Sequence, residues 1–91
     1  MPELADFRTA IHTPFSLEGS HVLRLVEAQA TGERAPGMER APFRLAFLGP
    51  ADPVLPQRTY RLEHGALGAL DIFLVPIASD AGGTTYEAIF A

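Results

Sequence analysis

The feature that most constrains this chain is the patterning of apolar residues in its last third. The runs Leu55–His64 and Thr84–Phe90 alternate between apolar and polar residues, and Leu70–Ala78 between them is apolar on both alternating faces. Because successive side chains of a β-strand point to opposite faces, this pattern predicts three strands, the middle one central or covering an interface. The segments 65–68 and 79–83 separate the runs and supply glycine where tight turns need positive φ.

The same pattern continues through the first half of the chain. Ile11–Leu17, Ser20–Ala30 and Pro42–Gly49 are further strand candidates, and Pro2–Phe7 predicts a short helical turn that lays its apolar residues on the domain. Six strands in sequential hairpins predict an all-β fold, a small antiparallel barrel or sandwich forming a single domain over 1–91. The residues expected to face the interior are Phe43, Leu45, Phe47, Tyr60 and Leu62. In the other strands, alternation groups the following residues on one face: Ile11, Thr13, Phe15 and Leu17; Leu23, Leu25 and Glu27; Leu70, Ile72 and Leu74; and Tyr86, Ala88 and Phe90.

The core available to such a chain is small. A globule of 91 residues buries only roughly 60–65% of its unfolded surface. Cysteine is absent, so neither a disulfide framework nor a thiolate metal site can reinforce the fold. Stability must therefore come from packing or from assembly.

Thr31–Ala41 has no periodicity and is the one long loop, a candidate for mobility or partner contact.

The charge pattern limits the classes of partner. The formal net charge is −4, and acidic residues are scattered along the whole chain. This distribution does not provide the basic surface that phosphates require, so we expect no nucleic-acid partner. The first residues carry acid where a secretory signal carries base, and no apolar run is long enough to span a membrane. We expect a cytoplasmic protein without membrane contact, with export by another route left open.

Three histidines raise the question of a metal site. His12, His21 and His64 belong to separate strands or strand ends, and no two of them have the short spacing of a local ligand pair. A metal site would need these residues to converge in the tertiary structure. We predict no metal site, and the sequence contains no cofactor-binding motif.

A catalytic site can be assembled only by combining distant residues. Ser20, His21 and Asp71 supply the residue types of a nucleophilic triad, and His64 offers another base for a hydrolase. A Gly-x-Ser-x-Gly elbow is absent, and a small β domain with few long loops offers little wall for a substrate pocket. We therefore predict no enzyme and no catalytic residue, and keep a small hydrolase as a further alternative.

The aromatic residues suggest a second hypothesis, a small-ligand-binding β-barrel. Small barrels either fill their interior with side chains or hold one small ligand. Aromatic side chains are common in the walls of ligand cavities. The residues that could line such a cavity are Phe15, Phe43, Phe47, Tyr60, Phe73, Tyr86 and Phe90.

The doubly apolar strand carries the main functional hypothesis. Both of its faces could pack inside one barrel or sandwich. Alternatively, Phe73, Val75 and Ile77 together with Ile89 form an interface, because monomers rarely expose a large contiguous apolar patch. The last strand, which reaches Phe90, could also leave an edge that accepts a partner strand. We predict a non-enzymatic structural or protein-interaction module that binds a protein partner or self-associates as a homo-oligomer.

Four motifs add a resemblance to this interpretation. They are Pro-Phe-Arg-Leu-Ala-Phe-Leu-Gly-Pro at 42–50, Leu-Pro-Gln-x-Thr-Tyr-x-Leu-Glu-His at 55–64, Leu-Gly-x-Leu-x-Ile-Phe-Leu-Val-Pro at 67–76 and Tyr-Glu-Ala-x-Phe at 86–90. Together they resemble a family of small uncharacterised bacterial domains. The resemblance implies companions of phage-tail-collar or fibre-like proteins with no established activity, so the module would be an accessory of a phage-tail-like or fibre-like assembly. The chain closes with Phe90-Ala91 where that family more typically has Phe-Asn.

Overall fold

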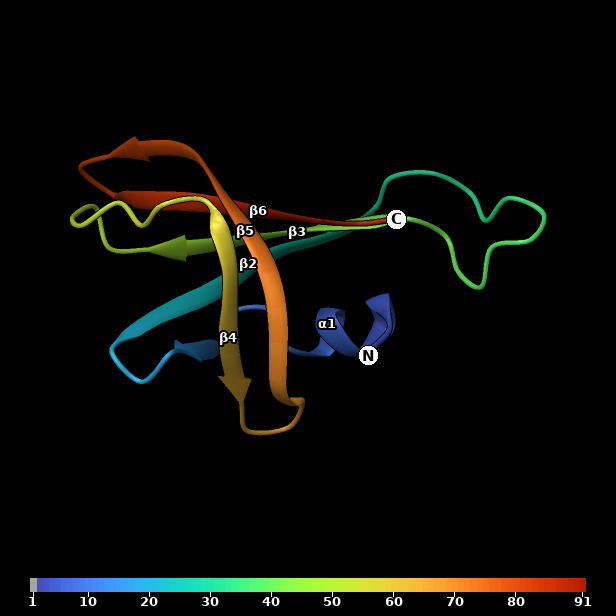
Figure 1. The fold of residues 1–91 in the computed structure, drawn as a ribbon, viewed down its shortest axis with the longest axis horizontal. Coiled ribbons are helices and arrows are strands. Elements are labelled where there is room, and N and C mark those ends of the chain that lie inside the picture. The colour runs from blue at the N-terminus through green and yellow to red at the C-terminus, as the bar shows by residue number, and fades with distance from the viewer. Residues whose placement is uncertain (1) are drawn as a thin grey trace.

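The computed structural model describes residues 2–91 and shows six β-strands that close into one antiparallel barrel, preceded by a short helix (Figure 1). The elements are α1 Leu4–Thr9, β1 Pro14–Leu17, β2 His21–Ala30, β3 Phe43–Gly49, β4 Arg58–His64, β5 Gly68–Asp80 and β6 Gly83–Phe90. The predicted all-β fold with about six strands and an N-terminal helical turn is confirmed. Of the two closures considered, the chain forms the barrel.

The strands follow one another around the barrel in the order β1-β2-β3-β6-β5-β4. Two meanders, β1-β2-β3 and β4-β5-β6, meet where β3 pairs with β6 and where β1 pairs with β4. The prediction of hairpins in strict sequence is wrong at one connection, because segment 50–57 carries the chain from β3 past β6 and β5 to β4. Alternation shows which face of a strand is buried, but it does not identify the neighbouring strand.

The long strand β5 changes partner midway. Residues 68–74 pair with β4, and the ladder to β6 begins at Val75, which lies opposite Glu87. Figure 1 shows β5 beginning beside β4 and then crossing to β6, where it ends. The prediction that β6 is a sheet edge is wrong for most of its length, since β6 lies between β3 and β5. Only residues 88–90 pair with β3 alone.

The interior predicted from alternation is confirmed at most positions. Phe90 is half-buried and packs against the core. Glu27 is a correction: the ladder to β3 shifts between Leu25 and Glu27, so Val26 is an extra residue and Ala28 packs against the core in place of Glu27. Of the residues that alternation grouped on one strand face, those that are buried are Phe15, Leu17, Leu23, Leu25, Phe43, Leu45, Phe47, Tyr60, Leu62, Leu70, Ile72, Leu74, Tyr86 and Ala88.

Some strand boundaries differ from the prediction. β1 begins at Pro14 instead of Ile11, because His12 adopts a positive φ of 68° that interrupts extended backbone. Thr13 likewise lies before the strand. β4 begins at Arg58, and β5 runs on so that the turn to β6 contains only residues 81 and 82.

The two ends of the barrel are closed by different parts of the chain. At the end that we call the aromatic end, α1 places Phe7 within 5.9 Å of Phe43 and of Phe90, measured between ring centroids. Phe43 and Phe90 stack at 4.6 Å. Phe7 is fully buried and Leu4 packs against the core, so the predicted seating of the helix on the domain is confirmed.

At the other end, which we call the tyrosine end, two buried rings reach segment 50–57 through their hydroxyl groups. The Tyr60 hydroxyl donates a hydrogen bond to the carbonyl of Pro56, and the Tyr86 hydroxyl accepts one from the backbone N–H of Leu55 at 2.9 Å. Leu55 also packs against the core. These two hydrogen bonds fix a segment that belongs to neither helix nor strand.

The loop predicted at Thr31–Ala41 connects β2 to β3 without helix or strand. Its base is joined by a backbone hydrogen bond from Thr31 to Pro42 at 2.9 Å. Figure 1 shows the loop extending away from the barrel, on the side where the chain also ends. Its suggested role in partner contact stays a prediction.

Candidate functional site

The outer surface of β5 and β6 carries an exposed apolar face. Of the four residues predicted for a partner interface, Phe73 is 50% exposed, Ile77 49% and Ile89 61%, and Val75 is half-buried. We call these four residues the outer apolar face. The inner residues of β5 point into the core, so alternation leaves these side chains outside. The sequence allowed both faces of the doubly apolar strand to pack inside the barrel. In the structure one face of this strand is buried and the other is exposed.

The outer apolar face lies where β5 and β6 separate. Phe73 belongs to the part of β5 that pairs with β4, and Ile89 lies beyond the last pair of the β5–β6 ladder. Ile77 lies at the irregularity between Pro76 and Ala78, where the ladder shifts by one residue. A bulge of this kind bends the strand and re-aims its side chains. The face therefore combines exposed apolar groups with a local interruption of the barrel's hydrogen-bond ladder.

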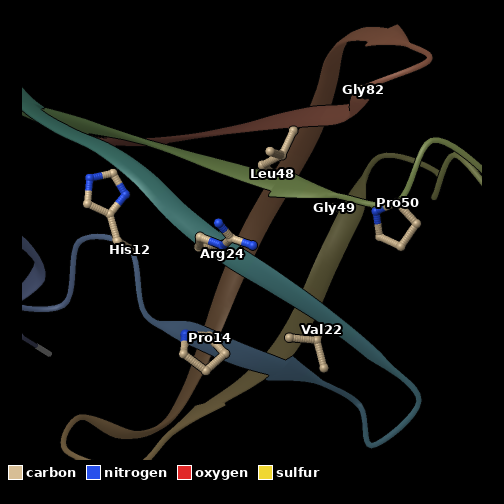
Figure 2. A pocket seen from close by; sticks show the side chains of 8 residues that line it. All are labelled: His12, Pro14, Val22, Arg24, Leu48, Gly49, Pro50 and Gly82. Carbon is tan, nitrogen blue, oxygen red and sulfur yellow. The ribbon is translucent and has the colours of Figure 1, made fainter.

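A second feature is a groove of about 570 Å³ on the outer face of β1, β2 and β3. The residues at its floor are cross-strand neighbours, because Pro14 lies opposite Arg24, and Arg24 lies opposite Leu48. Figure 2 shows Arg24 in the middle of the groove, with His12 on one side and Val22 and Pro50 on the other. Backbone of glycines at the end of β3 and in the β5–β6 turn completes the lining.

The other strand arginines are held in ion pairs. Arg58 binds Glu18 at 2.7 Å, and Arg61 binds Asp71 at 2.7 Å. The hydrogen bonds from Arg58 hold the pKa of Glu18 below its ordinary value, and Glu18 in return raises the pKa of Arg58. Asp71 similarly raises the pKa of Arg61 through its hydrogen bond. These pairs are open to solvent, where screening keeps their contribution to stability small.

A third pairing lies on the other side of the barrel. Arg44 of β3 binds Glu87 of β6 at 3.0 Å and Glu27 of β2 at 3.5 Å, so one guanidinium links three adjacent strands. Glu87 is the residue opposite Val75, which places this ion pair directly beside the outer apolar face. The pair forms a polar border to the exposed apolar side chains.

The three histidines do not come together. His64 uses both ring nitrogens: Nδ1 accepts from the backbone N–H of Ala66 and of Leu67 at 3.0 and 3.2 Å, and Nε2 lies 2.8 Å from the Thr13 hydroxyl. Since Thr13 donates its proton to the carbonyl of Ala10, Nε2 carries the histidine proton. This imidazole fixes the β4–β5 turn and is occupied by these contacts. No cluster of three potential metal ligands occurs within residues 2–91.

The three residues considered for a nucleophilic triad do not form one hydrogen-bonded group. Ser20 and His21 hydrogen-bond to each other at 3.1 Å on the exposed β1–β2 turn. The carboxylate of Asp71 is instead bound to Arg61 on the neighbouring strand. In this arrangement Asp71 orients an arginine and gives no support to the imidazole of His21.

A comparison with protein-family models matches residues 2–90, nearly the entire chain, to a family described as a domain of unknown function, DUF6916. The chain belongs to the DUF6916 family. The resemblance to an uncharacterised domain family is thereby confirmed. No curated protein matches the chain, and no solved structure does.

Within this DUF6916 domain the predicted cavity-lining aromatics serve different purposes. Five of them are buried in the core: Phe15, Phe43, Phe47, Tyr60 and Tyr86. Phe73 is instead half-exposed on the outside, so its assignment to an interior cavity is wrong, because it lies on the opposite face of β5 from Leu74. The groove lies outside the barrel. No helix within residues 2–91 of the DUF6916 chain is long and apolar enough to cross a membrane.

The groove residues of the DUF6916 domain were not identified from the sequence. Arg24 occupies a polar position in an alternating strand, where an arginine is usually a solvated surface charge. Its lack of a carboxylate neighbour depends on which strands lie beside β2. The left-handed backbone of His12 gives no sequence signal either, since the residue is not glycine.

Proposed function

We propose that this domain is a non-enzymatic protein-interaction module that assembles with a second copy of itself through the outer apolar face. The observation that carries the proposal is the exposure of Phe73, Ile77 and Ile89, each over about half of its surface or more, on adjacent strands. Isolated exposed apolar residues are common, whereas a large apolar patch on one face is typical of interaction sites, and we expect these three side chains to form one.

Covering these side chains would contribute favourably to the free energy of association. Fully burying a Phe or Ile side chain contributes about 1.5–3 kcal/mol, so covering three that are half-exposed contributes on the order of 2–4 kcal/mol per copy. A second copy is a suitable occupant because a two-fold contact pairs a patch with itself, and an apolar patch is complementary to an apolar patch. The Arg44–Glu87 ion pair at its border provides the polar rim usual in such interfaces.

The separation of β5 from β6 supports the same proposal. Residues 88–90 pair only with β3, and β5 pairs only with β4 up to residue 74. Backbone groups in such a gap need a partner, and an associating chain or ordered water can provide it. A second copy seated here would cover the apolar side chains and the interrupted ladder together.

The test is the mass of the purified protein in solution, measured by light scattering over a dilution series. We expect a defined oligomer in the wild type and a monomer in the double variant Phe73→Thr, Ile89→Thr, since threonine retains strand propensity without the apolar surface. Val54→Thr is the matched control, because Val54 is 48% exposed but lies in segment 50–57. A wild type that stays monomeric at every concentration contradicts self-association, as does a double variant with unchanged mass.

Several predictions from the sequence lack support from these observations. A role as an accessory of a phage-tail-like or fibre-like assembly rests on the resemblance alone, and so does the bacterial origin that it implies. The cytoplasmic location likewise stays a prediction. The alternatives of a small-ligand barrel and of a hydrolase have no observation in their favour, since the buried aromatics pack in the core and His64 is held by a turn.

A further inference from the structure

The groove over β1, β2 and β3 combines apolar walls with two nitrogen-bearing side chains. Pro14, Val22, Leu48 and Pro50 provide apolar surface, and His12 and Arg24 provide the ionisable groups. The chain as a whole is acidic, with a net charge of −4. The groove nevertheless contains no carboxylate among its lining residues. Its charge character is therefore opposite to that of the molecule.

Arg24 differs from the other arginines on the strands. Arg44, Arg58 and Arg61 are each bound to at least one carboxylate at 3.0 Å or less. Arg24 has no ion pair within residues 2–91, and its cross-strand neighbours are Pro14 and Leu48, which carry no charge. A guanidinium between apolar neighbours provides a preorganised fork of donors for a carboxylate that the chain itself does not supply.

The shape of the groove favours one of two classes of anionic ligand, a peptide segment instead of a small molecule. Sites for small molecules usually enclose most of the ligand surface. This groove is open, since Val22 at its side is 56% exposed. An open channel across three strands suits a chain segment that passes through it, with one side chain on the guanidinium and its neighbours on the apolar walls.

We infer that the groove binds an acidic segment of a partner protein, placing a carboxylate on Arg24 and an adjoining aliphatic side chain against Val22 and Leu48. His12, which lines the same groove, donates a second hydrogen bond to the same segment. This site is separate from the outer apolar face and does not depend on the proposed self-association. The domain then has one surface for a second copy and another for a different protein.

The test begins with selection of binders from a random peptide library on the immobilised protein. We expect enrichment of sequences in which an acidic residue adjoins an aliphatic one. The affinity of the selected peptide is then measured by calorimetry. Loss of a charge-assisted hydrogen bond should weaken binding about tenfold or more in Arg24→Gln. Arg34→Gln is the matched control, because it removes the same charge from the exposed loop between β2 and β3.

The outcomes distinguish the alternatives. Failure to enrich acidic peptides, or unchanged affinity in Arg24→Gln, overturns the inference. Free acetate that displaces the peptide at equal concentration also overturns it, since the site would then recognise a small carboxylate. A peptide in which glutamine replaces the acidic residue should bind as weakly as the acidic peptide binds Arg24→Gln. The Phe73→Thr, Ile89→Thr variant should retain full peptide affinity, which separates this test from that of the proposed function.

Discussion

The two ends of the barrel are closed by different kinds of interaction. At the aromatic end, Phe7 from the helix packs against Phe43 and Phe90 through its aromatic ring. At the tyrosine end, the hydroxyl groups of Tyr60 and Tyr86 bind backbone of segment 50–57. Apolar packing contributes in proportion to the area buried, whereas a hydrogen bond contributes little net energy but fixes direction. The aromatic end should therefore supply stability, and the tyrosine end should supply shape.

The largest effect is expected from Phe7→Ala. The ring is fully buried, and its removal leaves a cavity beside the stacked rings of Phe43 and Phe90, so the free energy of unfolding should fall by about 3–5 kcal/mol. Denaturant unfolding followed by circular dichroism measures the change. Phe7→Leu is the control and should retain most of the stability. A loss below about 1 kcal/mol for Phe7→Ala would show that the helix is dispensable.

The second-largest loss of stability is expected at the tyrosine end, where β6 begins. Gly83 has a φ of 140°, and an added Cβ would lie 2.7 Å from the carbonyl oxygen of Gly49. Gly83→Ala should cost about 1–3 kcal/mol, through backbone strain and overpacking together. Gly65→Ala is the matched control, because its φ is ordinary and no atom lies within 4 Å of the added Cβ. Equal midpoints of thermal unfolding for the two variants would contradict the expectation.

A smaller effect is expected from Tyr86→Phe. The substitution keeps the ring but leaves the N–H of Leu55 without its acceptor, at a cost of about 0.5–1.5 kcal/mol. Hydrogen exchange of the Leu55 amide should accelerate more than exchange in the β3–β6 ladder. Uniform acceleration in both places would mean that the hydroxyl stabilises the whole barrel and does not act on segment 50–57 specifically.

The smallest effect near neutral pH concerns the ionisation of Tyr60. Burial raises the pKa of its hydroxyl above the ordinary value of 10.0, although Arg58 acts in the opposite direction. A group whose pKa is raised by folding favours the folded state fully below its unfolded pKa. Stability should therefore decline as pH rises above about 10, and Tyr60→Phe should remove this part of the decline. If the free energy of unfolding declined equally in wild type and variant between about pH 9 and 12, the assignment to Tyr60 would be contradicted.

The interior was predictable because it depends on local alternation. Leu45, Phe47 and Tyr60 are buried as their strand positions predicted. The order of the strands was not predictable, since a period of two contains no information about which strand pairs with which. Glu27 was misassigned because one bulged residue, Val26, reverses the faces of all later positions in β2.

The two candidate surfaces differed in how far the sequence revealed them. The outer apolar face appears in the sequence as a strand with apolar residues on both faces, and Phe73 and Ile77 are indeed exposed. The groove has no such signal, because Pro14, Arg24 and Leu48 come from three separate strands. Their meeting depends on the ladder registers and on the bend at His12. A site formed by unlike residues from several strands requires the tertiary structure to be recognised.

The contact of Phe7 with Phe90 has a further consequence for the connectivity of the chain. Residues near the two termini lie together at the aromatic end, while the loop between β2 and β3 takes part in no strand ladder. A short linker from residue 91 back to residue 2 would therefore allow the polypeptide to be reopened near Gly37 with every strand pairing retained. In such a circular permutant the helix would become an internal segment, and β2 would become the last strand of the barrel.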